Sequence, residues 1–239
     1  MKGDKVKERQ ELVLVPGLLC TETVFSGQIP GLSSGADITI ADSTAHDSIA
    51  AMAGAIIATA TAPFALAGFS MGGYVALEVV RRAPEMVRRL ALVATTAHPD
   101  DASKSARRRD FMAIARRGRF RGMTRGLLPL YLHPQSLKNE RLCETIIAMS
   151  QSFGAETFIA QQQAILGRDD ARDWLAAITC PTLIIAGADD PFMPLAEQQY
   201  MAREIGDAHL AVVAGSGHMV PLEQPAEVCA LMEEWLEPA

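Results

Sequence analysis

Several features that would mark a specialised protein class are missing from this chain of 239 residues. Its four cysteines are scattered without C-x-x-C spacing, so neither a disulfide framework nor a metal or other cofactor is expected. The net charge is −6, which gives a nucleic-acid-binding role no electrostatic support. No apolar run makes a clean membrane span, and the charged start MKGDKVKERQE holds no signal-peptide core. We therefore expect a cytoplasmic protein with no nucleic-acid or membrane partner.

What is present suits one large folded unit. Hydrophobic residues make up 49% of the chain and charged residues 21%, in keeping with an ordinary globular core. Short apolar runs bounded by turn residues alternate with segments of helical periodicity. This alternation predicts an α/β fold, a mostly parallel sheet of about six strands with helices on both faces. The predicted strands cover residues 11–15, 37–41, 64–69, 89–94, 182–186 and 209–214.

The alternation stops between the fourth and fifth predicted strands. There the segments SARRRDFMAIARR, LKNERLCETIIAMSQ and ETFIAQQQAILG have the periodicity of amphipathic helices, and no convincing strand separates them. We predict a helical cap over residues 97–171, inserted after the fourth strand into a core made of residues 1–96 and 172–239.

Ser70 stands where the third predicted strand meets a predicted helix of residues 71–83. Gly68 and Gly72 flank it at minus two and plus two, where a sharp turn needs an absent Cβ so that strand and helix can approach each other. The pattern Gly-x-Ser-x-Gly is that of a nucleophile elbow, which presents a serine hydroxyl at the top of a sheet. An acid and a histidine are then expected later in the chain, in that order.

Four motifs in order, VPGLL, GFSMGG, IAGADDPFMP and GSGHMVPLEQP, resemble those of the α/β-hydrolase superfamily, specifically its small capped esterases and lactonases. The resemblance spans nearly the whole chain. It implies a Ser-His-Asp triad in which Ser70 attacks a carbonyl carbon and His218, in the last motif, is the general base. The acid that orients His218 is Asp190 by resemblance to the family's Gly-x-x-Asp-x-x-x-Pro loop, and spacing alone leaves its neighbour Asp189 open.

The resemblance also implies an oxyanion hole made of two backbone N–H groups. One belongs to Met71, directly after the nucleophile and at a helix N-terminus. The other lies in the turn after the first strand, at Leu18, with Leu19 as the alternative. This chain has Pro16-Gly17 where the family usually has His-Gly, so the geometry of that turn is open.

The predicted cap is the part expected to choose the substrate. Residues 97–131 hold nine Lys and Arg against three acids, which leaves a net −12 for the rest of the chain. Such asymmetry can attract an anionic partner, a carboxylate-bearing ester, an acyl-CoA or an acyl carrier protein, although a solvated helix face explains it too. Four apolar residues are candidates for the pocket wall: Leu19, Phe120, Met193 and Met219.

We thus expect a hydrolase that cleaves a small or medium carboxylic ester or lactone through an acyl-enzyme. The same triad types also serve thioester hydrolysis, carbon–carbon bond hydrolysis and perhydrolysis, and Ser70 does not choose among them. A ligand-binding protein that keeps the fold without catalysis is the alternative from another functional class.

Overall fold

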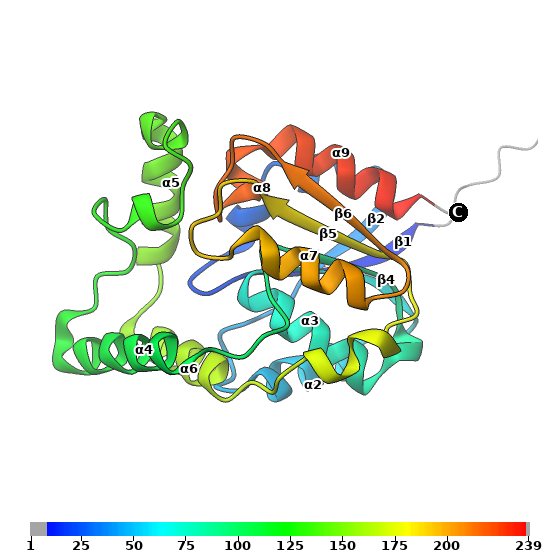
Figure 1. The fold of residues 1–239 in the computed structure, drawn as a ribbon, viewed down its shortest axis with the longest axis horizontal. Helices are drawn as coiled ribbons and strands as arrows, with labels where there is room; N and C mark the ends of the chain where they lie inside the picture. Colours follow the sequence, from blue (N-terminus) through cyan, green and yellow to red (C-terminus); the bar gives the residue numbers. More distant parts are fainter. Residues whose placement is uncertain (1–8, 238–239) are drawn as a thin grey trace, which may run out of the picture.

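A computed structural model describes residues 9–237 and arranges six strands in one parallel sheet of order β2-β1-β3-β4-β5-β6 (Figure 1). This confirms the predicted α/β fold. The strands, all close to their predicted positions, are β1 (Gln10–Val15), β2 (Ala36–Ile40), β3 (Phe64–Phe69), β4 (Val87–Val93), β5 (Thr182–Gly187) and β6 (Ala208–Val213).

The central strand β3 shows why the sheet has two cores. All six of its residues are buried, and successive side chains point to opposite faces. Phe64 and Leu66 pack into the core beneath α2 (Ile49–Thr59) and α3 (Met71–Arg82). Ala65 and Ala67 pack into the core beneath α9 (Pro225–Leu236). Helices therefore cover both faces, as an all-parallel sheet requires.

The helices predicted after Ser70 and in the inserted segment are present, and two short helices were not predicted. Ser48 caps α2 by accepting from the Ala51 amide at 3.2 Å. The four-residue helices α1 and α8 are too short for an apolar repeat to be recognised. The helices are α1 (Ile29–Leu32), α2 (Ile49–Thr59), α3 (Met71–Arg82), α4 (Ala102–Ile114), α5 (Glu140–Gln151), α6 (Ala155–Leu166), α7 (Leu195–Glu204), α8 (Val220–Glu223) and α9 (Pro225–Leu236).

Helices α4, α5 and α6 lie between β4 and β5 in the chain, where the inserted helical segment was expected. Figure 1 shows them beyond the end of the sheet toward which the arrows of β5 and β6 point. In open α/β sheets the crevice outside the carboxyl ends of the strands is where ligands bind. The division of the chain into a core and a separate cap domain stays a prediction.

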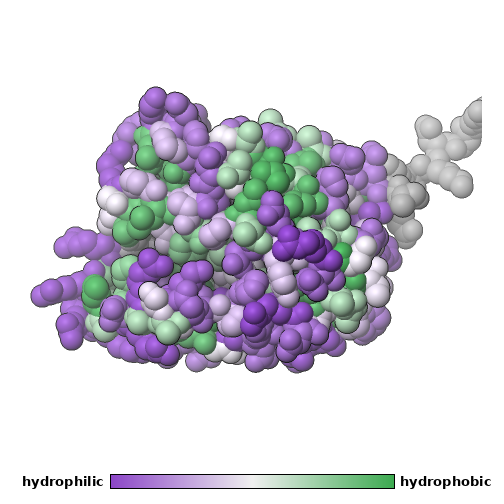
Figure 2. Space-filling view, viewed as in Figure 1, coloured by the Kyte–Doolittle hydropathy of each residue, from purple (hydrophilic) through white to green (hydrophobic). Residues whose placement is uncertain are grey.

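The surface agrees with the composition. Figure 2 shows mostly hydrophilic side chains, which also project from the end of the molecule that holds α4, and a hydrophobic patch near the β6 edge of the sheet. Val212 on that edge strand is 43% exposed. Among residues 9–237, no helix has the length and apolar character needed to cross a membrane. The expected cytoplasmic location stays a prediction.

Candidate active site

Ser70 occupies a strained turn between β3 and α3. Its backbone angles are φ 53° and ψ −113°, a left-handed region that a residue with a side chain rarely adopts. The surrounding chain holds this conformation. The Ser70 amide donates to the Val93 carbonyl at 2.9 Å, and the Ser70 carbonyl accepts from the Thr95 hydroxyl at 2.8 Å. The strain is thus supported by strand β4 and the loop that follows it.

Both glycines of the elbow are required by close backbone contacts. A Cβ on Gly68 would lie 2.2 Å from the Gly72 carbonyl oxygen, and a Cβ on Gly72 would lie 2.0 Å from the Val15 carbonyl oxygen. Those partners are backbone atoms that cannot move aside. The close approach of strand and helix that the sequence pattern predicts is present.

His218 and Asp190 complete a hydrogen-bonded chain with Ser70. His218 Nε2 lies 3.0 Å from Ser70 Oγ, and His218 Nδ1 lies 2.8 Å from Asp190 Oδ2. All three residues are buried, with no more than 8% of any of them exposed. The side chains come from turns after β3, β5 and β6, which end at the same edge of the sheet. This is the arrangement that lets an imidazole accept the serine proton while a carboxylate orients it.

The loop after β5 gives the neighbouring acids Asp189 and Asp190 different surroundings. Asp190 Oδ1 accepts from the amides of Phe192 and Met193, each at 2.8 Å, which leaves Oδ2 for His218. The Asp189 side chain is 55% exposed, and its carboxylate lies 3.7 Å from His133. The geometry therefore places Asp190, and not Asp189, against the imidazole.

Three aromatic rings surround His218, and the sequence motifs did not predict them. The ring centroids of Phe192, Phe69 and Tyr131 lie 4.9, 5.3 and 5.9 Å from that of the imidazole. Tyr131 comes from the inserted segment, and its carbonyl accepts from the His218 amide at 2.7 Å. The inserted segment therefore helps to position the histidine.

Glu223 of α8 fastens the loop that carries His218. Its carboxylate accepts from the Gly217 amide at 2.9 Å and from the His133 amide at 2.8 Å. Burial raises the pKa of Glu223, and these hydrogen bonds offset only part of that rise. Only the tertiary arrangement could reveal this role, because α8 has no apolar periodicity of its own.

Of the predicted oxyanion-hole amides, two remain available and the alternative does not. Met71 is the first residue of α3, so its amide has no partner within the helix. Within the described part of the chain, no hydrogen bond uses the Leu18 amide. The Leu19 amide instead donates to Gln161 Oε1 at 2.9 Å. The arrangement therefore favours Leu18 over Leu19 as the partner of Met71.

Gln161 ties helix α6 to the turn after β1. It is completely buried, and its Nε2 donates to the carbonyl of Ser43 at 3.0 Å while its Oε1 accepts from Leu19. Leu19 has a positive φ of 53°, so the turn is held in an uncommon conformation. The shape of the predicted oxyanion turn thus depends on a side chain 142 residues away.

A cavity of about 550 Å³ lies between the sheet and helices α4 to α6, and Ser70 and His218 line it. Its size is that of a small-molecule site. Phe120 packs against Phe158 at 5.1 Å between ring centroids and forms part of an apolar region of the wall. All four residues predicted for the pocket line this cavity: Leu19, Phe120, Met193 and Met219.

One part of the wall is charged. Asp100 lies between two guanidinium groups, with 2.5 Å to Arg108 Nε and 2.8 Å to Arg168 Nη2. Burial by itself would raise the pKa of Asp100, but the two arginines outweigh burial and hold that pKa below its ordinary value of 3.8. Asp100 is therefore ionised at neutral pH.

The comparisons with known proteins show a family and a fold. A model of the alpha/beta hydrolase family matches residues 12–231. The fold is similar to that of a thermophilic esterase from Thermogutta terrifontis, solved with malate bound, at a TM-score of 0.85 and 28% identity, covering 95% of this chain and 89% of the esterase.

Curated relatives cover less of the molecule. A 2-hydroxymuconate semialdehyde hydrolase of Pseudomonas putida is 28% identical over 70% of this chain and 60% of its own length. A 3-oxoadipate enol-lactonase of Acinetobacter baylyi is 33% identical over 37% of this chain and 32% of its own length. The chain thus spans less than two thirds of the length of these relatives, which are hydrolases named for different substrates.

Proposed function

Because the chain belongs to the alpha/beta hydrolase family, we propose that it cleaves a small or medium carboxylic ester or lactone through an acyl-enzyme on Ser70. The observation that carries the proposal is the hydrogen-bonded chain from Asp190 through His218 to Ser70, which opens onto the 550 Å³ cavity. A cavity of this size suits a small molecule.

In the first half of the reaction, Ser70 Oγ attacks the carbonyl carbon while its proton passes to His218 Nε2, 3.0 Å away. The negative charge that forms on the carbonyl oxygen is stabilised by the amides of Met71 and Leu18, at the start of α3 and in the turn after β1. Asp190 stabilises the imidazolium through its hydrogen bond to Nδ1. Collapse of the intermediate breaks the ester C–O bond, and His218 gives its proton to the departing alcohol.

In the second half, His218 removes a proton from water, and the resulting oxygen nucleophile attacks the acyl carbon on Ser70. The same two amides receive the negative charge again. Collapse releases the carboxylic acid and returns the proton from His218 to Ser70 Oγ. For a lactone, the alcohol and the acid are two ends of one product.

The test compares the purified full chain with Ser70→Ala, using p-nitrophenyl acetate and p-nitrophenyl butyrate. We expect Ser70→Ala to lower kcat to background, since loss of a serine nucleophile costs about 10⁶-fold. A fluorophosphonate probe should label the wild type and leave Ser70→Ala unlabelled. The control is Ser34→Ala, because Ser34 is an exposed serine whose hydroxyl bonds to the nearby Gly31 carbonyl.

Equal slow rates in wild type and Ser70→Ala would contradict the esterase proposal. If the probe labelled Ser70 while neither ester turned over, the nucleophile would stand but the ester substrate would not. Thioesters, carbon–carbon bonds and peroxide would then be the substrates to examine. Absence of both labelling and turnover would support a ligand-binding protein without catalysis.

A further inference from the structure

Helix α4 presents a two-part face to the cavity. Its cavity-lining residues recur at spacings of three and four along the helix, so their side chains share one side. The first half of this face is cationic and the second half is apolar. Arg109, next to Arg108 in the chain, is exposed and does not line the cavity. The lining residues of α4 and the position after it are Lys104, Arg107, Arg108, Phe111, Ile114 and Ala115.

Arg108 has one donor group left over. Its Nε donates to Asp100 at 2.5 Å and its Nη1 donates to Gln162 Oε1 at 2.8 Å. No partner for its Nη2 is found within residues 9–237, although Arg108 is only 8% exposed. The Nη2 group is therefore the part of this largely buried guanidinium that can donate hydrogen bonds outside the protein. Since Arg108 lines the cavity, a ligand there can supply that acceptor.

Arg168 anchors this cluster and brings it close to Ser70. Its side chain donates to the carbonyls of Ile165 and His98 and to Asp100, and its guanidinium lies 4.3 Å from the Tyr74 ring centroid. Tyr74 follows Ser70 by four residues, about one helical turn or 6 Å along α3. Both terminal nitrogens of Arg168 therefore donate to the protein, whereas the whole Nη2 group of Arg108 stays unused within the described residues.

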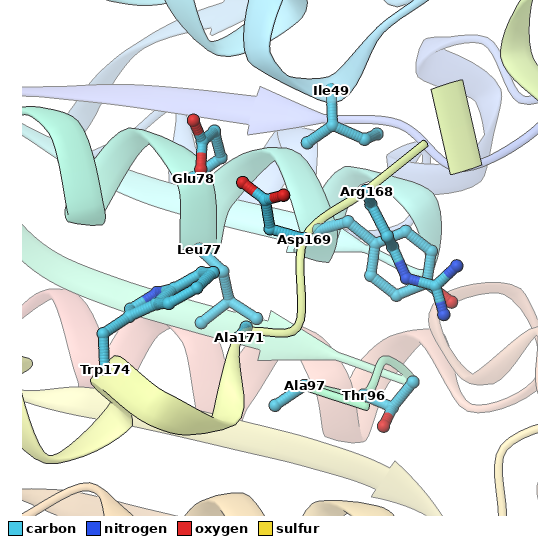
Figure 3. A pocket seen from close by; sticks show the side chains of 10 residues that line it. Ile49, Leu77, Glu78, Thr96, Ala97, Arg168, Asp169, Ala171 and Trp174 are labelled. Atoms are coloured by element: carbon cyan, nitrogen blue, oxygen red, sulfur yellow. The ribbon is translucent and has the colours of Figure 1, made fainter. Parts of the chain in front are cut away.

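A small pocket behind Arg168 does not compete for a ligand. Figure 3 shows Arg168 and Trp174 at opposite ends of it, with Leu77 and Ala171 between them. Its volume of about 20 Å³ leaves room for a single water molecule. A substrate anion must therefore approach from the larger cavity.

The charge of the cavity wall is positive overall. Its two acids are already paired, Asp100 with the two arginines and Glu197 with His98 at 2.7 Å. Arg107 and Lys104 have no side-chain partner within the described residues. The positively charged lining residues are Lys104, Arg107, Arg108, Arg119, Arg121 and Arg168.

We propose that Arg108, with Arg107 and Lys104 beside it, binds a carboxylate carried by the substrate at the end remote from its scissile carbonyl. This inference rests on the proposed ester or lactone hydrolysis and names the class of substrate, a monoester of a short dicarboxylic acid or a lactone of a short hydroxy-dicarboxylic acid. A carboxylate presents two acceptor oxygens, which match guanidinium donors in charge and geometry. The apolar part of the wall near Phe111 and Phe120 is left for the remaining aliphatic groups.

The test measures kcat/KM for mono-p-nitrophenyl glutarate and for p-nitrophenyl butyrate, an anionic and a neutral ester of similar size. In Arg107→Gln and in Arg108→Gln, the ratio of the anionic to the neutral value should fall about tenfold or more, as for a lost hydrogen bond between charged groups. Arg109→Gln makes the same charge change on the same helix outside the cavity, and its ratio should stay at the wild-type value.

Two results would overturn the proposal. If Arg109→Gln lowered the ratio as much as Arg108→Gln, general attraction by the basic helix would explain the preference. If Arg107→Gln and Arg108→Gln both stayed active and kept the wild-type ratio, these arginines would not bind the carboxylate of the substrate.

A binding experiment separates this proposal from the proposed hydrolysis. Glutarate is titrated calorimetrically into Ser70→Ala protein, alone and combined with Arg107→Gln, Arg108→Gln or Arg109→Gln. Binding that is lost with either of the first two and kept with Arg109→Gln supports the carboxylate site even if no ester is turned over. Binding of inorganic phosphate in place of glutarate would overturn the carboxylate assignment.

Discussion

Helices α3 and α4 face the same cavity but are built in opposite ways. Residues 71–80 of α3 are all buried, whereas Arg108 and Met112 are the buried residues of α4. A side-chain substitution in α3 alters packing against the sheet beneath it, whereas most substitutions on α4 replace a side chain that is exposed to solvent. Under the proposed function, the residues that react therefore lie beside a helix that tolerates few substitutions, and the residues proposed to bind the substrate lie on a helix that tolerates many.

The largest effect expected after that of Ser70→Ala separates the two neighbouring acids of the β5 loop. Asp190→Asn should lower kcat about 10⁴-fold, because an amide cannot hold the imidazole in the tautomer that accepts the serine proton. Asp189→Asn is the matched control and should be nearly neutral, since that side chain is 55% exposed. Ester turnover measures both. Similar losses in the two variants would contradict the assignment of Asp190.

The contrast between rigid core and tolerant inserted segment can be tested with glycines. Gly72→Ala puts a Cβ 2.0 Å from the Val15 carbonyl oxygen and should lower the free energy of unfolding by about 3 kcal/mol or more. Gly126→Ala, in the inserted segment, meets nothing within 4 Å and should change it by less than about 0.5 kcal/mol. Urea unfolding measures both. A stable Gly72→Ala protein would show that the elbow can relax.

The Asp100 cluster should stabilise the protein in a pH-dependent way. Asp100→Asn leaves Arg108 and Arg168 without their shared anion and should cost about 3 kcal/mol at pH 7. The pKa of Asp100 is lower in the folded protein than in the unfolded chain. Its contribution to stability is therefore complete above pH 3.8 and is lost as the pH falls through the folded-state pKa.

The free energy of unfolding should be measured with urea at pH 7 and at a pH below 3.8. We expect the difference in this free energy between wild type and Asp100→Asn to shrink in acid. Asp110→Asn, an exposed acid of α4, serves as the control. A gap that widened in acid would contradict the lowered pKa.

Gln161 joins the two regions, so its replacement should affect both stability and rate. Gln161→Leu leaves the Leu19 amide and the Ser43 carbonyl unpaired and should cost about 1–3 kcal/mol of stability. Because the turn that holds Leu18 would loosen, kcat should fall more than KM rises. Gln163→Leu, an exposed position on the same helix, is the control. An unchanged kcat would mean that the turn keeps its shape without Gln161.

The smallest effect is expected in the apolar part of the cavity wall. Phe120→Ala removes one ring of the Phe120–Phe158 pair and should shift preference toward longer acyl chains by about tenfold at most. A series of p-nitrophenyl esters measures the shift. Val212→Ala, on the edge strand β6, should leave the series unchanged. Unchanged selectivity in Phe120→Ala would remove Phe120 from the substrate pocket.

Much of the fold could be predicted because its signals are local. The buried run of β3 and the glycines around Ser70 each report on the backbone within a few residues. Differences arise where packing extends an element: β4 begins at Val87, two residues before the predicted start, because a 3₁₀ turn at Pro84–Met86 leads directly into it. Helix α8 escaped prediction because four residues carry no periodicity.

The sequence alone determined the type of chemistry that this chain can support. A serine on a glycine-flanked turn, a later acid and a later histidine are local patterns, and their order along the chain can be read directly. Which acid meets the histidine, which amide stays free and which arginine keeps an unused donor were decided by the tertiary structure. Those answers depend on contacts between residues far apart, such as Gln161 with Leu19 and Arg108 with Gln162, and no local pattern records such meetings.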